Sequence, residues 1–232
     1  ITTPTYSLIV RVMDNGVGNL SSQATITVNL TNSNSCTATG NITYQVWNNI
    51  GATVTISTLT SNMNYPGNPT STTLINSLEA PINQANEYGA RIAGYICAPA
   101  TGSYTFWIAS DDNGELWLST DDQEINKVRI ASHNAYTASR EWNKYSSQKS
   151  VSINLIQGKK YYIEALMKDA TAGDNLAVGW LKPGQTGNVP SEVIPGAVLS
   201  PFETAQSVLV TSVALPSTMT INSGSEAMIL AN

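Results

Sequence analysis

The chain has 232 residues, of which 12% are charged, and a formal net charge of −5. It is long enough for one or two domains with buried cores. The acidic balance gives no basic surface for nucleic acid, and no run approaches the roughly 20 apolar residues that span a bilayer. Few charges with abundant Thr, Ser, Asn and Gly are typical of secreted or surface-displayed β-proteins. We therefore expect an extracellular or cell-surface protein without membrane insertion.

The first segment, residues 1–32, has the pattern of two β-strands. Apolar residues alternate with polar ones over residues 6–12 and 24–28, on either side of a turn that begins at Asp14. A two-stranded hairpin is marginal in water by itself, so these strands must pack on something else. They resemble the last two strands of a cadherin-type repeat, in which an Asp in the place of Asp14 helps to bind calcium. The acidic linker of that family is missing here, which favours a solvated turn for Asp14.

The central segment, residues 36–202, contains many short strand patterns separated by Gly and Pro turns. The stretch from Trp47 to Tyr88, rich in Thr, Asn and Ser and containing three prolines, is typical of an irregular surface loop, and no convincing amphipathic helix is present. This pattern predicts an all-β sandwich or barrel. Strands are expected at residues 40–47, 88–97, 104–109, 115–119, 128–131, 151–155, 161–168 and 176–181.

Two cysteines, Cys36 and Cys97, stand at the start and in the middle of this segment. In an exported chain such a pair most often forms a disulfide, which here would close a loop of about 60 residues and stabilise the fold by about 4 kcal/mol. Two buried thiols in an intracellular protein are the alternative. Two Cys and a single His fall short of the four ligands of a structural zinc site.

The third segment, residues 206–232, resembles the opening strands of a bacterial immunoglobulin-like domain: an apolar strand leads through a Pro turn to a Gly turn. Its length of about 27 residues cannot close a sandwich of roughly 100. The chain also begins Ile-Thr-Thr-Pro, inside a strand pattern. We therefore expect both ends to belong to neighbouring modules of a longer, multidomain and bacterial polypeptide.

Two adjacent carboxylates, Asp111 and Asp112, lie between the expected strands 104–109 and 115–119. They repel each other unless a cation lies between them, and a hard, oxygen-seeking ion such as Ca²⁺ is the natural candidate. In an extended strand their side chains would point to opposite faces, so binding one ion requires an unusual backbone. The residues alone leave a simple hairpin turn equally open, because Asp, Asn and Gly all favour turns.

At the Asp-Asp segment the central region resembles a protective-antigen-type domain, named after the anthrax toxin component. The resemblance implies an all-β barrel or sandwich, carried in glycosidases, adhesins, toxins and yeast flocculins. The segments that carry it are, in chain order, residues 90–99, 102–119, 140–149, 158–168, 173–180 and 194–202.

In lectin-like members of that family, two successive Asp residues joined by a cis peptide hold a calcium ion, and the ion binds vicinal sugar hydroxyls. By position, the resemblance assigns these roles to Asp111 and Asp112. It makes residues 168–175 the second calcium loop, with Asp174, or second to it Asp169, as the third carboxylate. Together with Asn175, these residues are the expected carbohydrate site. Some members have lost the metal and are structural modules.

The resulting hypothesis is a calcium-dependent, glycan-binding module without catalytic residues. The alternative is a structural spacer, with or without calcium. An enzyme is not expected, since no nucleophile motif such as Gly-x-Ser-x-Gly accompanies the single histidine, His133. A second acidic pair, Asp121 and Asp122, is expected in a solvated loop, and most of the tryptophans are expected in the core.

Overall fold

The computed structural model describes residues 5–13, 21–29, 36–202 and 228–229, which belong to two compact units. In the unit formed by the chain ends, β1 (Thr5–Met13) pairs antiparallel with β2 (Ser21–Asn29), and β14 (Met228–Ile229) pairs with β1. The predicted strand pair at residues 6–12 and 24–28 is thus confirmed. Asp14 and most of residues 206–232 lie outside the described residues, so the cadherin-like and immunoglobulin-like modules stay predictions.

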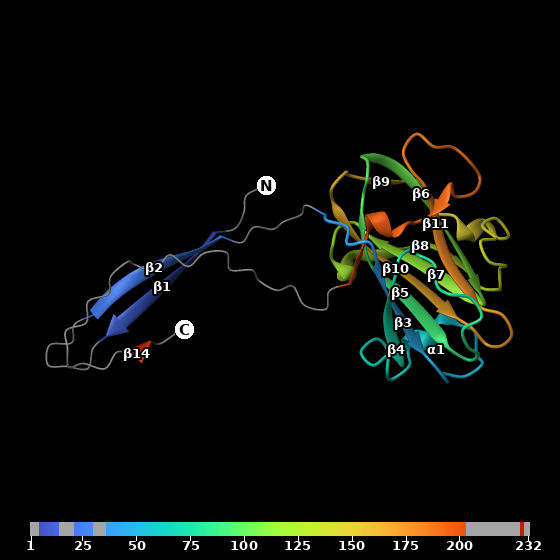
Figure 1. The fold of residues 1–232 in the computed structure, drawn as a ribbon, viewed down its shortest axis with the longest axis horizontal. Coiled ribbons are helices and arrows are strands. Elements are labelled where there is room, and N and C mark those ends of the chain that lie inside the picture. The colour runs from blue at the N-terminus through green and yellow to red at the C-terminus, as the bar shows by residue number, and fades with distance from the viewer. Residues whose placement is uncertain (1–4, 14–20, 30–35, 203–227, 230–232) are drawn as a thin grey trace. The chain divides into compact units, whose positions relative to one another are not determined.

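The second unit is a β-sandwich of two antiparallel sheets, which confirms the predicted all-β class (Figure 1). Short 3₁₀ turns lie at Glu124–Asn126, Ser146–Gln148 and Gly196–Val198. The strands and the helix are β3 (Ile42–Trp47), α1 (Ile56–Thr60), β4 (Ser71–Ile75), β5 (Gly89–Cys97), β6 (Gly102–Asp111), β7 (Asn113–Ser119), β8 (Lys127–His133), β9 (Ile153–Leu155), β10 (Lys160–Lys168), β11 (Asn175–Leu181), β12 (Glu192–Val193) and β13 (Leu199–Pro201).

The larger sheet has the order β4-β3-β5-β10-β7-β8, with β13 paired to β5, and the smaller sheet has the order β12-β11-β6-β9. Their facing sides form the main core. Tyr104, Phe106 and Ile108 of β6 are fully buried in it, as their period-two spacing predicts. Trp180 of β11 packs beside Tyr104, with ring centroids 5.4 Å apart. Burying side chains of this size contributes roughly 1.5–3 kcal/mol each, so this layer anchors the strand ends described below.

The stretch between Trp47 and Tyr88 is more regular than the sequence predicts, because it contains α1 and β4. The prediction of an irregular loop there was wrong. Ile56 and Leu59, three residues apart, face one side of α1 and pack in a small core with Trp47. β4 is an edge strand on β3 and is almost entirely exposed. An exposed edge strand needs no apolar alternation, so its sequence carries no strand signal.

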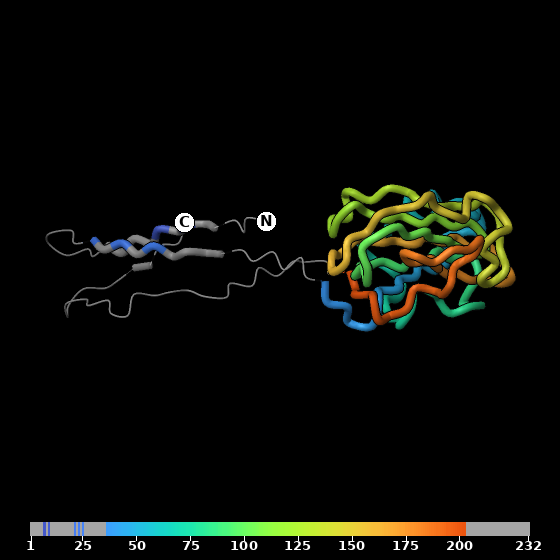
Figure 2. Tube along the Cα trace, turned by 90° about the horizontal axis from the view of Figure 1, so that it is seen from above, coloured from blue at the N-terminus to red at the C-terminus, as the bar shows by residue number. Residues whose placement is uncertain are grey.

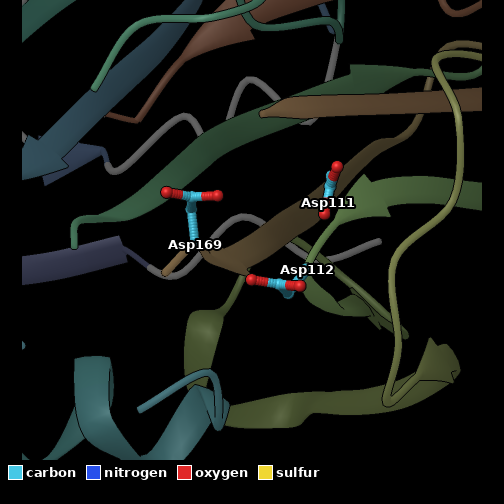
Figure 3. Close-up of side chains that lie close together, drawn as sticks. All are labelled: Asp111, Asp112 and Asp169. Carbon is cyan, nitrogen blue, oxygen red and sulfur yellow. The ribbon is translucent and has the colours of Figure 1, made fainter. Parts of the chain in front are cut away.

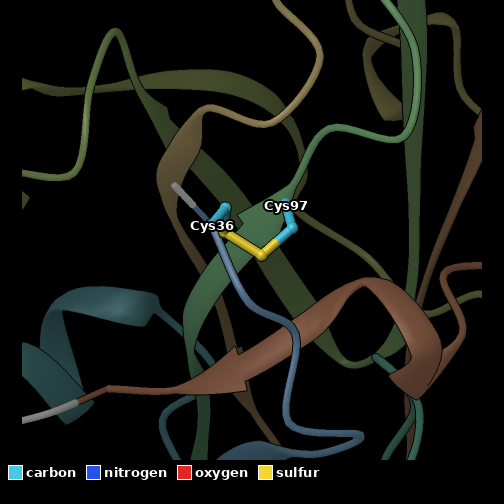
Figure 4. Close-up of a disulfide and its surroundings, with 2 residues drawn as sticks. All are labelled: Cys36 and Cys97. Atoms are coloured by element: carbon cyan, nitrogen blue, oxygen red, sulfur yellow. A yellow bond between two sulfur atoms is a disulfide. The ribbon is translucent and has the colours of Figure 1, made fainter. Parts of the chain in front are cut away.

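The predicted disulfide between Cys36 and Cys97 is present, and it ties the start of the sandwich to the end of β5 (Figure 4). The segments that begin and end this unit, blue and red in the right-hand part of Figure 2, lie side by side. The Thr39 N–H donates a hydrogen bond to the Leu199 carbonyl (2.9 Å). Among the described residues, no helix has the length and apolar character needed to cross a membrane.

Candidate functional site

The two adjacent aspartates lie where the chain passes from one sheet to the other. Asp111 ends β6 in the smaller sheet, and Asn113 begins β7 in the larger sheet. The two strands do not pair with each other, so the hairpin alternative is wrong. The peptide bond between Asp111 and Asp112 is cis, as the family resemblance implies.

The second predicted loop lies beside this junction because of the strand register. β10 ends at Lys168, which pairs with Asn113, and β11 begins at Asn175, which pairs with Asp111. Residues 169–174 therefore connect the same two sheets as the β6–β7 junction does, one strand further along in each sheet.

Three carboxylates meet at this end of the sandwich. Asp111, Asp112 and Asp169 each offer one oxygen, and these oxygens lie within 4.8 Å of one another (Figure 3). Asp169 is fully buried, whereas Asp111 and Asp112 are half-buried. Asp112 Oδ2 also accepts a hydrogen bond from the Ala170 N–H (3.0 Å), which ties the two loops together. We call these three residues the carboxylate cluster.

The junction leaves many buried oxygens without a hydrogen-bond donor. Of eight buried, unpaired side-chain polar atoms in the described residues, five belong to the β6–β7 junction and the β10–β11 loop. They are both Asp169 oxygens and the Oδ1 atoms of Asn113, Asp174 and Asn175. Leaving a buried acceptor unpaired costs about 1–3 kcal/mol, and more when it is charged. A set made only of carboxylate and amide oxygens fits Ca²⁺, which takes six to eight hard oxygen ligands.

The charge state of the cluster reflects this crowding. Burial, followed by repulsion from Asp112, raises the pKa of Asp169 from 3.8 to about 7. The same two causes raise the pKa of Asp111 to about 6, although the Lys144 ammonium acts against them. Without a cation, the folded protein therefore keeps these two carboxyls protonated to a higher pH than the unfolded chain does.

The raised pKa values predict that the calcium-free protein loses stability as pH rises. A carboxyl whose pKa is higher in the folded than in the unfolded state stabilises the fold fully below about pH 4 and loses that contribution as pH passes the folded pKa. For Asp111 and Asp169 this window runs from 3.8 to about 7. We expect Tm in EDTA to fall between pH 5 and 8 more steeply in the wild type than in Asp169→Asn, as measured by thermal denaturation. Equal slopes would contradict the proposed ionisation.

Asp174 lies close enough to the carboxylate cluster for its charge to raise the pKa of Asp111 and Asp169, but its hydrogen bonds differ. Its Oδ2 accepts hydrogen bonds from the N–H groups of Gln84 (2.5 Å) and Ala85 (3.2 Å), so it holds the loop before β5 in place. It lies outside the group of mutually close ligand oxygens that contains Asp169. Its role as a calcium ligand stays a prediction. Asn175 lies beside Asp111 in the sheet, and its Nδ2 donates to the Thr137 carbonyl (2.9 Å).

Asp169 was predicted as second to Asp174, and Asn113 was not predicted as a ligand; the structure brings Asp169 into the group of close oxygens. Asp169 directly follows the apolar strand that ends at Lys168, and Asn113 directly precedes the strand β7. Asp174 also lies at a strand end, directly before β11. Chain position alone therefore does not separate Asp169 from Asp174, and their ranking depends on tertiary contacts.

His133 packs directly behind the junction. Its Nε2 lies 3.1 Å from Ser110 Oγ, and its Nδ1 lies 2.8 Å from the Ala135 carbonyl oxygen. Burial lowers the pKa of His133, which favours the neutral ring. Ser110 is fully buried, and the outer ring nitrogen faces a carbonyl rather than a carboxylate. This pair therefore supports the end of β6 and has neither the access nor the orienting acid of a nucleophilic triad.

Curated relatives match only part of this chain and contain it as a small part of their own length. The mouse N-acetyl-beta-glucosaminyl-glycoprotein 4-beta-N-acetylgalactosaminyltransferase 1 is 35% identical over 127 residues, which are 53% of this chain and 12% of that protein. Mouse fibrocystin-L is 36% identical over 138 residues, which are 58% of this chain and 3% of that protein. Both relatives are mammalian, and the bacterial origin expected from the sequence stays a prediction.

Solved structures show the same fold at low sequence identity. A PA14 sugar-binding domain from an RTX adhesin has a TM-score of 0.52 and 10% identity, covering 70% of this chain and 99% of that one. The PA14 domain of the MpAFP antifreeze protein has a TM-score of 0.51 and 14% identity, covering 72% and 94%. The family described as the PA14 domain matches residues 57–193, more than half of the chain. The chain therefore belongs to the PA14 domain family.

Proposed function

We propose that residues 36–202 form a calcium-dependent carbohydrate-binding module of a larger extracellular protein. The observation that carries this proposal is the carboxylate cluster, in which Asp111, Asp112 and Asp169 converge. Unpaired oxygens of Asn113 and Asn175 on the same strand ends add to the donor set. A Ca²⁺ ion bound there would neutralise the mutual repulsion of the carboxylates and give the buried oxygens a partner.

The carboxylate cluster is buried on one side and open to solvent on the other, which would let a bound Ca²⁺ ion also contact a sugar. Asp169 is fully buried, whereas Asp111 and Asp112 are half-buried, so the cluster has a closed side and a solvent side. Calcium takes six to eight ligands. Three carboxylates that each give one oxygen supply only three of these, so further ligands are needed. Three carboxylates already exceed the charge of one Ca²⁺ ion. Neutral sugar hydroxyls are therefore better further ligands than anionic groups.

An exposed aromatic side chain lies on a loop that contacts the site. Tyr136 is 57% exposed and is covered on one face by Lys144, whose Nζ lies 3.5 Å from the ring centroid. The loop is fixed to the site because the Thr137 N–H donates to the Ser110 carbonyl (2.8 Å). A tyrosine presents an apolar ring surface with a polar tip, which suits contact with a sugar ring.

The comparisons support a binding role rather than a catalytic one. The RTX adhesin domain of the same fold is described as sugar-binding. The transferase relative shares only 12% of its length with this chain, so we do not extend its activity to this module. We place the parent protein outside the cell, because the Cys36–Cys97 disulfide is typical of oxidising compartments. Its partners would be glycans or polysaccharide, together with neighbouring domains of the same polypeptide.

A glycan array probed with the whole chain tests this proposal. We expect binding to neutral glycans in millimolar calcium and loss of that binding in EDTA. Magnesium at the same concentration is the matched control, since its smaller octahedral shell suits this oxygen-rich cluster poorly. Calcium binding without a glycan signal would support the structural spacer instead. Glycan binding that persists in EDTA would show that the site lies elsewhere.

A further inference from the structure

A concave surface lies at the opposite end of the strands from the carboxylate cluster. This groove, of about 600 Å³, is lined by the end of β7, the start of β8, residues 149–156 and the start of β10. The cluster instead adjoins the start of β7 and the end of β10. The groove is therefore independent of the proposed calcium site.

Two open sheet edges form the walls of the groove. β8 ends the strand order of the larger sheet, and β9 ends that of the smaller sheet, so each has one backbone edge without a partner among the described strands. Apolar side chains remain exposed on these walls: Val128 on β8 is 55% exposed and Val151 before β9 is 78% exposed. An edge strand with unpaired N–H and C=O groups is a template for another extended chain.

The charge of the groove is opposite to that of the chain. Its lining contains Arg129, Lys149 and Lys159 and no acidic side chain, whereas the whole chain has 16 acidic and 11 basic residues. Arg129 is paired with Glu115, with a distance of 2.6 Å from Nη1 to Oε1. Among the described residues, Lys149 and Lys159 form no ion pair, and Lys149 Nζ lies 5.1 Å from the centroid of the Trp107 ring. Two cations are thus available to a ligand beside aliphatic side chains.

We propose that this groove binds an extended acidic segment of a partner protein. The segment adds as a strand to the open edge of β8, where main-chain hydrogen bonds hold it. Side chains of an extended strand alternate between two faces, so aliphatic residues can face the apolar lining while carboxylates reach Lys149 and Lys159. Charge complementarity selects an acidic segment over a basic one.

A fluorescein-labelled octapeptide that alternates valine and glutamate tests the proposal by fluorescence anisotropy with the whole chain in EDTA. EDTA keeps the result separate from calcium and glycan binding. We expect saturable binding that weakens at least tenfold in the double variant Lys149→Glu/Lys159→Glu. The matched control is Lys160→Glu/Lys182→Glu, which changes the net charge equally outside the groove lining and is expected to change binding less than twofold.

Backbone pairing has its own readout. The same peptide with N-methyl groups on alternate residues keeps its charges but loses the backbone N–H donors along one edge of the extended chain. We expect it to bind at least tenfold more weakly. Equal loss in the two double variants, equal binding of a valine–lysine peptide, or full binding of the N-methylated peptide would overturn the proposal. Laurate that displaces the peptide and binds more tightly would also overturn it, because the groove would then be an acyl-chain site.

Discussion

Replacing Asp111 and Asp112 together with Asn is expected to weaken calcium binding at least ~100-fold and to abolish calcium-dependent glycan binding. The amide keeps the shape of each side chain but removes two of the three negative charges in the carboxylate cluster. Calcium prefers anionic oxygens, and the remaining carboxylate of Asp169 cannot hold the ion alone. Calorimetric titration of calcium into the EDTA-treated variant measures the loss.

The chain contains a matched control for this experiment. Asp121 and Asp122 are also adjacent, and their carboxylates accept hydrogen bonds from Gln123 and Asn126 within an exposed loop. Changing that pair to Asn removes the same net charge, and we expect calcium affinity to change less than twofold. Loss of calcium binding in the control, or its retention in Asp111→Asn/Asp112→Asn, would contradict the site assignment.

The second large effect is expected when Asp169 and Asp174 are changed separately. Asp169→Asn should weaken calcium binding at least tenfold and raise the Tm of the calcium-free protein, since it removes a buried, unpaired carboxylate that faces Asp112. Asp174→Asn should instead lower stability by about 1–2 kcal/mol with or without calcium, because it weakens charge-assisted bonds to two backbone N–H groups.

Calorimetry and chemical denaturation, each with calcium and with EDTA, separate the two roles. The two substitutions remove the same charge, so the sign of the stability change in EDTA discriminates best between them. Asp169→Asn should stabilise the calcium-free protein, and Asp174→Asn should destabilise it. If Asp174→Asn weakened calcium binding more than Asp169→Asn did, Asp174 would be the third carboxylate ligand, as the sequence predicted. The arrangement of the carboxylate cluster would then be contradicted.

The strands of the sandwich were predictable because their residues carry a period-two pattern with turns between them. β6 and β10 lie within two residues of the expected positions at both ends. β4 was not predictable, since it is an exposed edge strand whose position depends on its partner β3. The short helix α1 was missed for a related reason: two apolar residues three apart are too few to distinguish a helical face from a loop.

The candidate site was predictable in part. The adjacent Asp111 and Asp112 stood out because like charges rarely occur side by side between apolar strands. The choice between Asp169 and Asp174 depends on the register of β10 against β7 and on the backbone N–H groups that surround each carboxylate. Both are tertiary features. Local sequence places the two residues in the same loop and gives no measure of which one faces the cluster.

Calorimetric titration of calcium into the EDTA-treated wild-type chain is the most direct test of the proposed calcium site. We expect saturable binding of one ion per chain at pH 7.5, with weaker binding at pH 5, where protons compete for Asp111 and Asp169. Absence of saturable calcium binding at pH 7.5 would contradict the proposed calcium site. The buried, unpaired oxygens of Asp169 would then need another explanation.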